Sequence, residues 1–145
     1  MGDHLFLDTS ALAKLYILEA GSAQVERIVG FSLSVSVSML AEFEFLSALQ
    51  RRRIDLTLTE DQAFRAKEAF YLDWASSYRR QLLSDPVLAV ARNLLGKYRL
   101  RTLDSLQLAS AVVLPTPALT FVTADRALAD IARREGLAAY DPNVA

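Results

Sequence analysis

The chain has 145 residues, 52% of them apolar, and a formal net charge of −1. This length fits one domain, so residues 1–145 are predicted to form a single domain with a sizeable buried core. The absence of cysteine excludes a disulfide framework and a thiolate metal site, and it suits a reducing cytoplasm, where we expect the protein to act. The near-neutral charge excludes a strongly basic nucleic-acid-binding protein.

The apolar segments do not predict export or insertion into a membrane. Asp8 and Lys14 interrupt the start of the chain, and no basic segment precedes a clean apolar run; a signal peptide is therefore not expected. The most apolar later stretch is broken by Pro115 and Pro117 and is shorter than a membrane span. We expect no membrane association.

Strand and helix patterns alternate along the whole chain. Short apolar or alternating runs predict strands, and runs of helix formers begun by Thr, Ser or Asp-Pro and ended by Gly or Pro predict helices. In chain order the predicted elements are a strand over 4–7, helices over 11–18 and 23–29, a strand over 33–38, helices over 39–53 and 59–74, a strand over 80–83, helices over 85–96 and 103–113, a strand over 119–123, a helix over 124–135 and a strand over 137–140. This alternation indicates an α/β fold with a parallel sheet covered on both faces.

Four acidic residues lie where a predicted strand gives way to a helix, or in the first turn of a helix. Asp8 ends the first strand, Asp125 follows the strand over 119–123, and Asp104 and Glu42 lie near the starts of their helices. In open α/β sheets ligands bind outside the carboxyl ends of the strands. We therefore expect Asp8, Glu42, Asp104 and Asp125 to converge in one pocket.

Each of these acids also has an ordinary explanation. Asp8 could cap a helix, and Asp104 and Asp125 could be first-turn acids that interact with the helix dipole. Glu42 could be a solvated helix residue, and Glu44, two positions later, competes with it because the two cannot face the same way. Glu42 is preferred because it is nearer the start of its helix.

Together the four carboxylates indicate a metal site. Acids held in one pocket repel each other unless a cation neutralises them. Oxygen ligands without Cys or clustered His select Mg²⁺ or Mn²⁺, which activate water for phosphodiester hydrolysis. The only histidine, His4, is expected in the core or at the rim of the sheet. The hydroxyls of Thr9, Ser10 and Thr123 are expected to support Asp8 and Asp125.

Three pairs or runs of arginine are candidates for phosphate binding, with solvated surface as the alternative for each. They are Arg51 to Arg53, Arg79 with Arg80, and Arg99 with Arg101.

Four segments resemble the PIN-domain family, and most closely the VapC-like toxins of prokaryotic type II toxin–antitoxin systems. They read LDTSALAKLY at 7–16, AEF at 41–43, TLDSLQLASA at 102–111 and FVTADRALADIARREG at 121–136. The resemblance implies a PIN-like three-layer α/β/α fold with a parallel five-stranded central sheet, and a Mg²⁺- or Mn²⁺-dependent endoribonuclease. It makes Asp8 and Asp104 the core metal ligands, with Glu42 and Asp125 completing the motif.

The resemblance also implies partners: an RNA substrate, a small cognate antitoxin that covers the toxin's groove, and a second copy in a homodimer. Two other classes of protein fit less well. An aspartyl phosphatase usually needs a second acid two residues after Asp8, where Ser10 stands, and Asp3 with Asp8 does not make the acid cluster of a phospho-receiver domain. The remaining alternative is a catalytically silent PIN-fold binding or scaffold module. The presence of all four acids argues against it.

Overall fold

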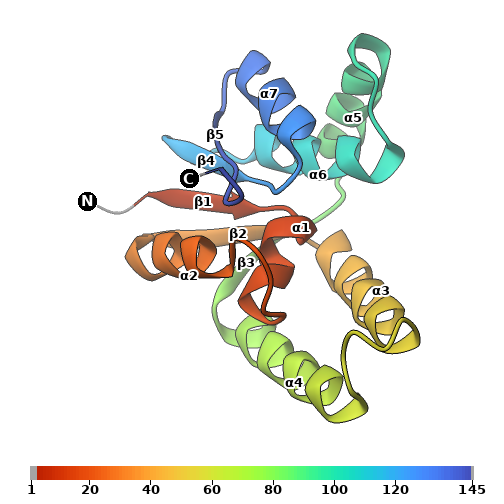
Figure 1. Cartoon of the computed structure of the whole chain (residues 1–145). Helices are drawn as coiled ribbons and strands as arrows, with labels where there is room; N and C mark the ends of the chain where they lie inside the picture. The colour runs from red at the N-terminus through yellow and green to blue at the C-terminus, as the bar shows by residue number, and fades with distance from the viewer. Residues whose placement is uncertain (1–2, 145) are drawn as a thin grey trace.

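The computed structural model describes residues 3–144 and contains one five-stranded sheet whose neighbouring strands are all parallel (Figure 1). Its strands are β1 (His4–Leu7), β2 (Ser34–Ser38), β3 (Tyr78–Gln81), β4 (Leu119–Val122) and β5 (Ala138–Tyr140). They lie in the order β3-β2-β1-β4-β5, so the first strand of the chain is the central strand of the sheet. The predicted parallel sheet is confirmed.

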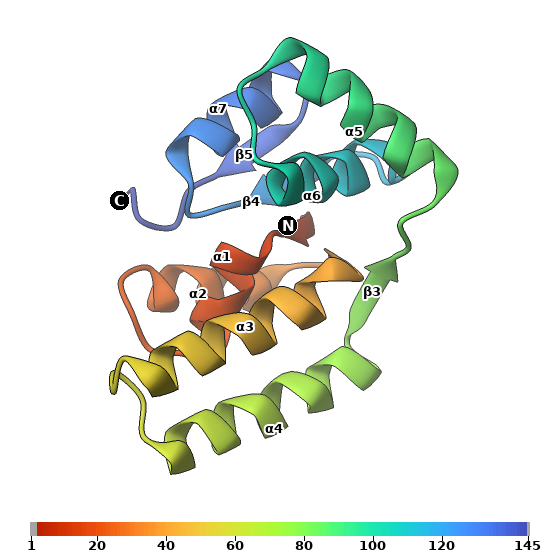
Figure 2. The same ribbon diagram turned by 90° about the vertical axis from the view of Figure 1, so that its right-hand side faces the viewer.

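Helices cover both faces of this sheet, which gives the predicted three layers (Figures 1 and 2). One face carries α1 to α4 and the other carries α5 to α7. The helices are α1 (Thr9–Leu12), the 3₁₀ turn η1 (Ala13–Leu15), α2 (Ser22–Phe31), α3 (Leu40–Ile54), α4 (Glu60–Ser76), α5 (Asp85–Lys97), α6 (Thr102–Val113) and α7 (Arg126–Arg134). Within residues 3–144, no helix combines the length and the apolar character needed to cross a membrane.

Each face of the sheet buries its own apolar core. Successive side chains of a strand point to opposite faces, so Leu5 packs into the core that contains Phe45 and Phe70, whereas Phe6 packs into the core that contains Phe121. The rings of Phe45 and Phe70 stack 4.2 Å apart, and those of Phe6 and Phe121 stack 5.8 Å apart. The apolar run Leu5 to Leu7 in the central strand is therefore explained by burial on both sides.

The segment after β1 differs from its prediction. The helix expected over 11–18 is replaced by the short α1 and η1, because the chain turns back on itself after Tyr16. Lys14 is only 6% exposed and donates its ammonium protons to the Ala20 carbonyl oxygen, 2.6 Å away, and to the carboxylate of Glu19, 3.1 Å away. These contacts override the helix propensity of the segment.

The strand β3 begins two residues earlier than the sequence pattern predicts. Tyr78 pairs with Val35 and Gln81 pairs with Ser38, and the Gln81 carbonyl oxygen accepts a hydrogen bond from the Met39 amide at 3.0 Å. Its partner β2 fixes this register, and β3 is an edge strand with weak alternation of its own. A local pattern could not reveal that constraint.

The carboxyl ends of two neighbouring strands, β1 and β4, meet at one edge of the sheet. Leu7 on β1 pairs with Val122 on β4, and the Asp8 amide donates to the Val122 carbonyl oxygen at 3.1 Å. Asp8 and Thr123 directly follow these two strands and are therefore brought together, although 115 positions separate them in the sequence.

Candidate active site

Asp8 lies at the base of a cleft on this edge and is held by three other residues. Its Oδ1 atom accepts hydrogen bonds from the Ser10 hydroxyl at 2.6 Å and the Ala11 amide at 3.2 Å, and its Oδ2 atom accepts one from the Thr123 hydroxyl at 2.7 Å. The residue is 4% exposed. Burial raises the pKa of Asp8 from 3.8 to about 6, and the charge of Asp104 adds to the rise, although these hydrogen bonds oppose it.

Asp104 and Asp125 approach the same cleft from helix starts on the other side of the sheet. Asp104 lies in the first turn of α6, and its Oδ2 atom accepts a hydrogen bond from Arg101 Nε at 3.0 Å. Asp125 caps α7 by accepting from the Leu128 amide at 3.1 Å, and its own amide donates to the Thr123 hydroxyl at 3.1 Å. Thr123 therefore connects Asp125 to Asp8.

The glutamate at this site is Glu44, and the expectation that Glu42 shares the pocket does not match the structure. Glu44 lines the cleft, whereas Glu42 accepts a hydrogen bond from the Tyr71 hydroxyl of α4 at 2.8 Å. Two residues along a helix correspond to about 200° of rotation, so only one of the two glutamates can face the sheet edge. Helix α3 begins at Leu40 and is rotated about its axis so that Glu44 faces the cleft.

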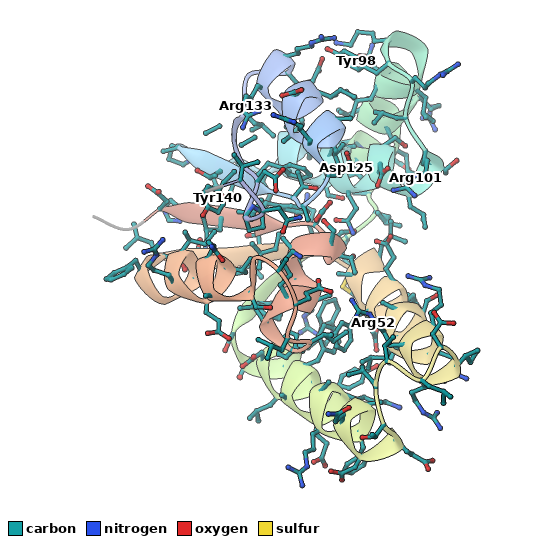
Figure 3. All side chains as sticks on the ribbon, in the orientation of Figure 1. Arg52, Tyr98, Arg101, Asp125, Arg133 and Tyr140 are labelled. Atoms are coloured by element: carbon teal, nitrogen blue, oxygen red, sulfur yellow. The ribbon has the colours of Figure 1, made fainter. Side chains whose placement is uncertain are left out.

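The cleft has a volume of about 620 Å³ and is lined by both acidic and basic side chains. The three aspartates and Glu44 are called its acidic part, and two further acids, Glu19 and Asp55, also line it. The cationic side chains that line it are Lys14, Arg51, Arg52 and Arg101. Arg101 lies near Asp125 and Arg52 lies on α3, below them in the view of Figure 3.

The basic residues of this cleft differ in how they are paired. Arg52 bonds to Glu19, and Arg101 bonds to Asp104. Arg51 donates to the Ser47 hydroxyl at 3.1 Å and forms no salt bridge within residues 3–144. Its neighbour Arg53 lies outside the cleft and pairs with Glu60 at 3.3 Å. Of the arginines identified in the sequence, Arg51 is thus the cleft residue with the fewest charged partners.

Lys14 and Gln107 are among the cleft residues that were not predicted from the sequence. Gln107 follows Asp104 by three positions, the spacing that places two helical residues on one face, so the position of Asp104 could have pointed to it. Lys14 would have required knowledge that the chain turns back after η1. In contrast, His4 bonds to Ser34 at 2.7 Å and does not line the cleft, as expected for a residue at the rim of the sheet.

The side chains in the cleft fit a hard divalent cation held by few protein ligands. In residues 3–144, no three Asp, Glu or His side chains lie close enough together to enclose an ion. Mg²⁺, however, usually binds through one or two carboxylates and keeps several waters. The acidic part of the cleft offers carboxylate oxygens and no sulfur, which is the ligand chemistry that Mg²⁺ and Mn²⁺ prefer.

A parallel α/β/α fold with carboxylates at the ends of its strands defines the class of protein, and comparison with known proteins identifies the family. A family model described as PIN domain matches residues 5–134. The chain therefore belongs to the PIN-domain family, as its resemblance predicted. No curated protein matches it closely enough to be a relative.

Several solved structures share the fold at low sequence identity. FitAcB from Neisseria gonorrhoeae superposes with a TM-score of 0.65 at 16% identity, covering 97% of this chain and 99% of that one. A toxin–antitoxin complex from Klebsiella pneumoniae gives 0.59 at 17%, covering 83% and 86%. VapBC-5 from Mycobacterium tuberculosis, from the VapBC family of toxin–antitoxin systems, gives 0.53 at 19%, covering 95% and 96%.

Proposed function

We propose that the chain is a single PIN domain that hydrolyses RNA phosphodiester bonds with the help of Mg²⁺ or Mn²⁺. The observation that supports this most directly is the convergence of four carboxylates, from four separate segments, in a cleft that also carries arginine. The acids suit a divalent cation, and the arginines suit a polyanion. Membership of the PIN-domain family, whose members are typically nucleases, points the same way.

In this proposal Asp8, Asp104 and Glu44 would hold the cation, with Asp125 beside them. A bound Mg²⁺ or Mn²⁺ supplies a Lewis acid that makes water a better nucleophile and neutralises phosphate charge. Ser10 and Thr123 orient Asp8 through their hydroxyls.

Purified protein should cleave single-stranded RNA in the presence of Mn²⁺ and stop when EDTA is added, because the acids alone cannot neutralise the phosphate. Cleavage is measured on a 5′-labelled oligonucleotide. The Asp8→Asn and Asp104→Asn variants, purified in the same way, should not cut. If they cut as well as the wild type, a contaminating nuclease is responsible and a catalytically silent binding module becomes the better explanation.

Replacing Arg51 by Ala should weaken RNA binding severalfold and lower its salt dependence, whereas Arg53→Ala should change neither. A side chain that contacts one phosphate contributes about 0.7 to the slope of log K against log salt for a single strand. Arg51 lines the cleft, whereas Arg53 pairs with Glu60 outside it, so the two variants differ in position but not in charge. Binding is measured by fluorescence anisotropy with Asp8→Asn as the background. Equal salt slopes for the two variants would show that Arg51 is a solvated surface residue and does not contact a phosphate.

We further propose that the protein is the toxin of a toxin–antitoxin pair, acting in the cytoplasm, as a homodimer when free. Two of the structural neighbours are toxin–antitoxin proteins. Large apolar side chains are also exposed on α3 and α4, including Phe43 at 68% and Leu72 at 72%. A small antitoxin would cover such side chains.

Expression of the chain alone should arrest growth, and co-expression of an antitoxin encoded next to it should relieve the arrest. Growth is followed by optical density after induction, with Asp8→Asn as the inactive control. Harmless expression of a folded wild-type chain that cleaves RNA in vitro would contradict the toxin role and leave the nuclease role standing.

A further inference from the structure

Gln107 is a buried polar residue at the wall of the acidic cleft. It lies on α6, one turn after Asp104, and is 2% exposed. It lines the same cleft as Asp104 and Glu44. Few glutamines are buried this completely, and such a residue must place its amide group against specific partners.

The Gln107 amide bonds to two residues from other elements. Its Nε2 atom donates to Glu44 Oε1 at 2.6 Å and to the Thr9 hydroxyl at 3.0 Å. The Thr9 hydroxyl in turn donates to the same Glu44 oxygen at 3.0 Å. A closed triangle of hydrogen bonds therefore joins α1, α3 and α6, and two donors converge on one carboxylate oxygen.

The other end of the amide shows what this arrangement favours. Gln107 Oε1 is buried and has no hydrogen-bond partner within residues 3–144. An unpaired buried carbonyl carries a desolvation cost. Turning the amide around would put this oxygen against the Glu44 carboxylate, where the two would repel each other. The observed orientation therefore leaves one acceptor unpaired and gives both amide protons to Glu44 and Thr9.

The same bonds restrict Glu44 to one position. Its Oε1 atom takes two hydrogen bonds, while its Oε2 atom takes none within residues 3–144. A glutamate has three side-chain torsions and would otherwise sample many rotamers on a half-exposed helix surface. Fixing one oxygen leaves the other available to a ligand in the cleft.

We propose that Gln107 is a positioning residue, which with Thr9 holds the Glu44 carboxylate in place so that it acts with Asp8 and Asp104 on a divalent cation. This rests on the proposed metal-dependent function of the cleft. Gln107 does not touch the cation; it acts through Glu44. Groups that orient a metal-binding carboxylate affect both metal affinity and activity.

The test compares Mn²⁺ binding by wild type, Gln107→Met and Ser110→Ala, measured by isothermal titration calorimetry. Met has nearly the volume of Gln but no N–H donor, and Ser110 is a buried polar residue one turn further along α6, outside the cleft, whose hydroxyl bonds to the Leu106 carbonyl oxygen. Gln107→Met should weaken Mn²⁺ binding about tenfold at unchanged stoichiometry, and Ser110→Ala should not. A purely structural role would instead lower the stoichiometry by unfolding part of the sample.

An exchange of the two residues separates position from charge. In the double variant Glu44→Gln with Gln107→Glu, an amide and a carboxylate still face each other, and Thr9 can still donate and accept. The negative charge, however, moves to the more buried position. Mn²⁺ binding should remain weak in this variant; recovery to the wild-type affinity would overturn the proposal, because a charge anywhere in the cluster would then be enough.

Two other results would be decisive. If the wild type binds Mn²⁺ and cleaves RNA while Gln107→Met does both equally well, the positioning role is wrong and the proposed function stands. If the wild type neither binds Mn²⁺ nor cleaves RNA, the proposed function fails and this proposal fails with it. A fall in kcat of Gln107→Met with an unchanged KM for RNA would support it independently.

Discussion

Replacing Asp8 by Asn should abolish RNA cleavage and, in metal-free buffer, make the folded protein more stable. The loss of cleavage follows from the proposed role of Asp8 as a ligand of the cation and should be at least about 1000-fold, since a metal ion supplies several kcal/mol of transition-state stabilisation. The gain in stability has a separate origin in the burial of the carboxylate. A charge without a cation is costly at this position, and Asn removes the charge while keeping an oxygen that can accept from Ser10 and Ala11.

The direction of the pH effect follows from the pKa of Asp8. Folding raises this pKa from 3.8 to about 6, so between these pH values the folded protein binds more protons than the unfolded chain. The free energy of unfolding therefore falls as the pH rises from about 4 to 6, by about 3 kcal/mol at 1.36 kcal/mol per pKa unit. The Asn variant should lack this fall and be more stable than the wild type near pH 7.

Thermal unfolding in EDTA from pH 4 to 8, followed by circular dichroism, measures this difference. Asp130→Asn is the matched control, because Asp130 is an exposed acid on α7 that pairs with Arg133 at the surface, and its replacement should leave the pH dependence of the wild type unchanged. Added Mn²⁺ should stabilise the wild type and not Asp8→Asn, because only the wild type binds it. An Asp8→Asn protein with the same pH dependence as the wild type would contradict a buried charge at this site.

Glu44→Gln should lower the rate of RNA cleavage about 100-fold, whereas Glu42→Gln should leave it within about twofold. The two substitutions are chemically identical and lie two residues apart on one helix. Glu44 lines the cleft, and Glu42 bonds to Tyr71 on α4. Gln at position 42 can still accept that hydrogen bond through its amide oxygen, so neither stability nor activity should suffer there.

Single-turnover cleavage at saturating protein measures the rate of the chemical step in both variants. Circular dichroism establishes that each is folded. If Glu42→Gln loses activity and Glu44→Gln keeps it, the assignment of the glutamate in the cleft is wrong, and the sequence-based choice of Glu42 was right.

Much of the fold could be predicted because its signals are local. The uninterrupted apolar run ending at Asp8 and the β-branched strand before Asp125 carry their own evidence for parallel strands buried on both faces. Elements that depend on partners were less accessible. The register of β3 is set by β2, and the short α1 and η1 depend on Lys14 bonding to the turn at Ala20.

The candidate site divides in the same way. Asp8 and Asp125 adjoin strand ends, and a position at a strand end can be read directly from the pattern. The choice between Glu42 and Glu44 depends on how α3 is rotated about its axis. An uncertainty of one residue in the start of the helix is enough to change that rotation. Gln107 looked like one more polar residue in an apolar helix, because its partners Thr9 and Glu44 are distant in sequence.

The central position of β1 has a consequence for the synthesis of the protein. Strand β1 pairs with β4, which is made more than a hundred residues later, and Thr123, which bonds to Asp8, comes after β4. A nascent chain therefore carries Asp8, Glu44 and Asp104 without the strand that joins them to Asp125. The complete cleft therefore cannot form until the ribosome has made the chain as far as Asp125.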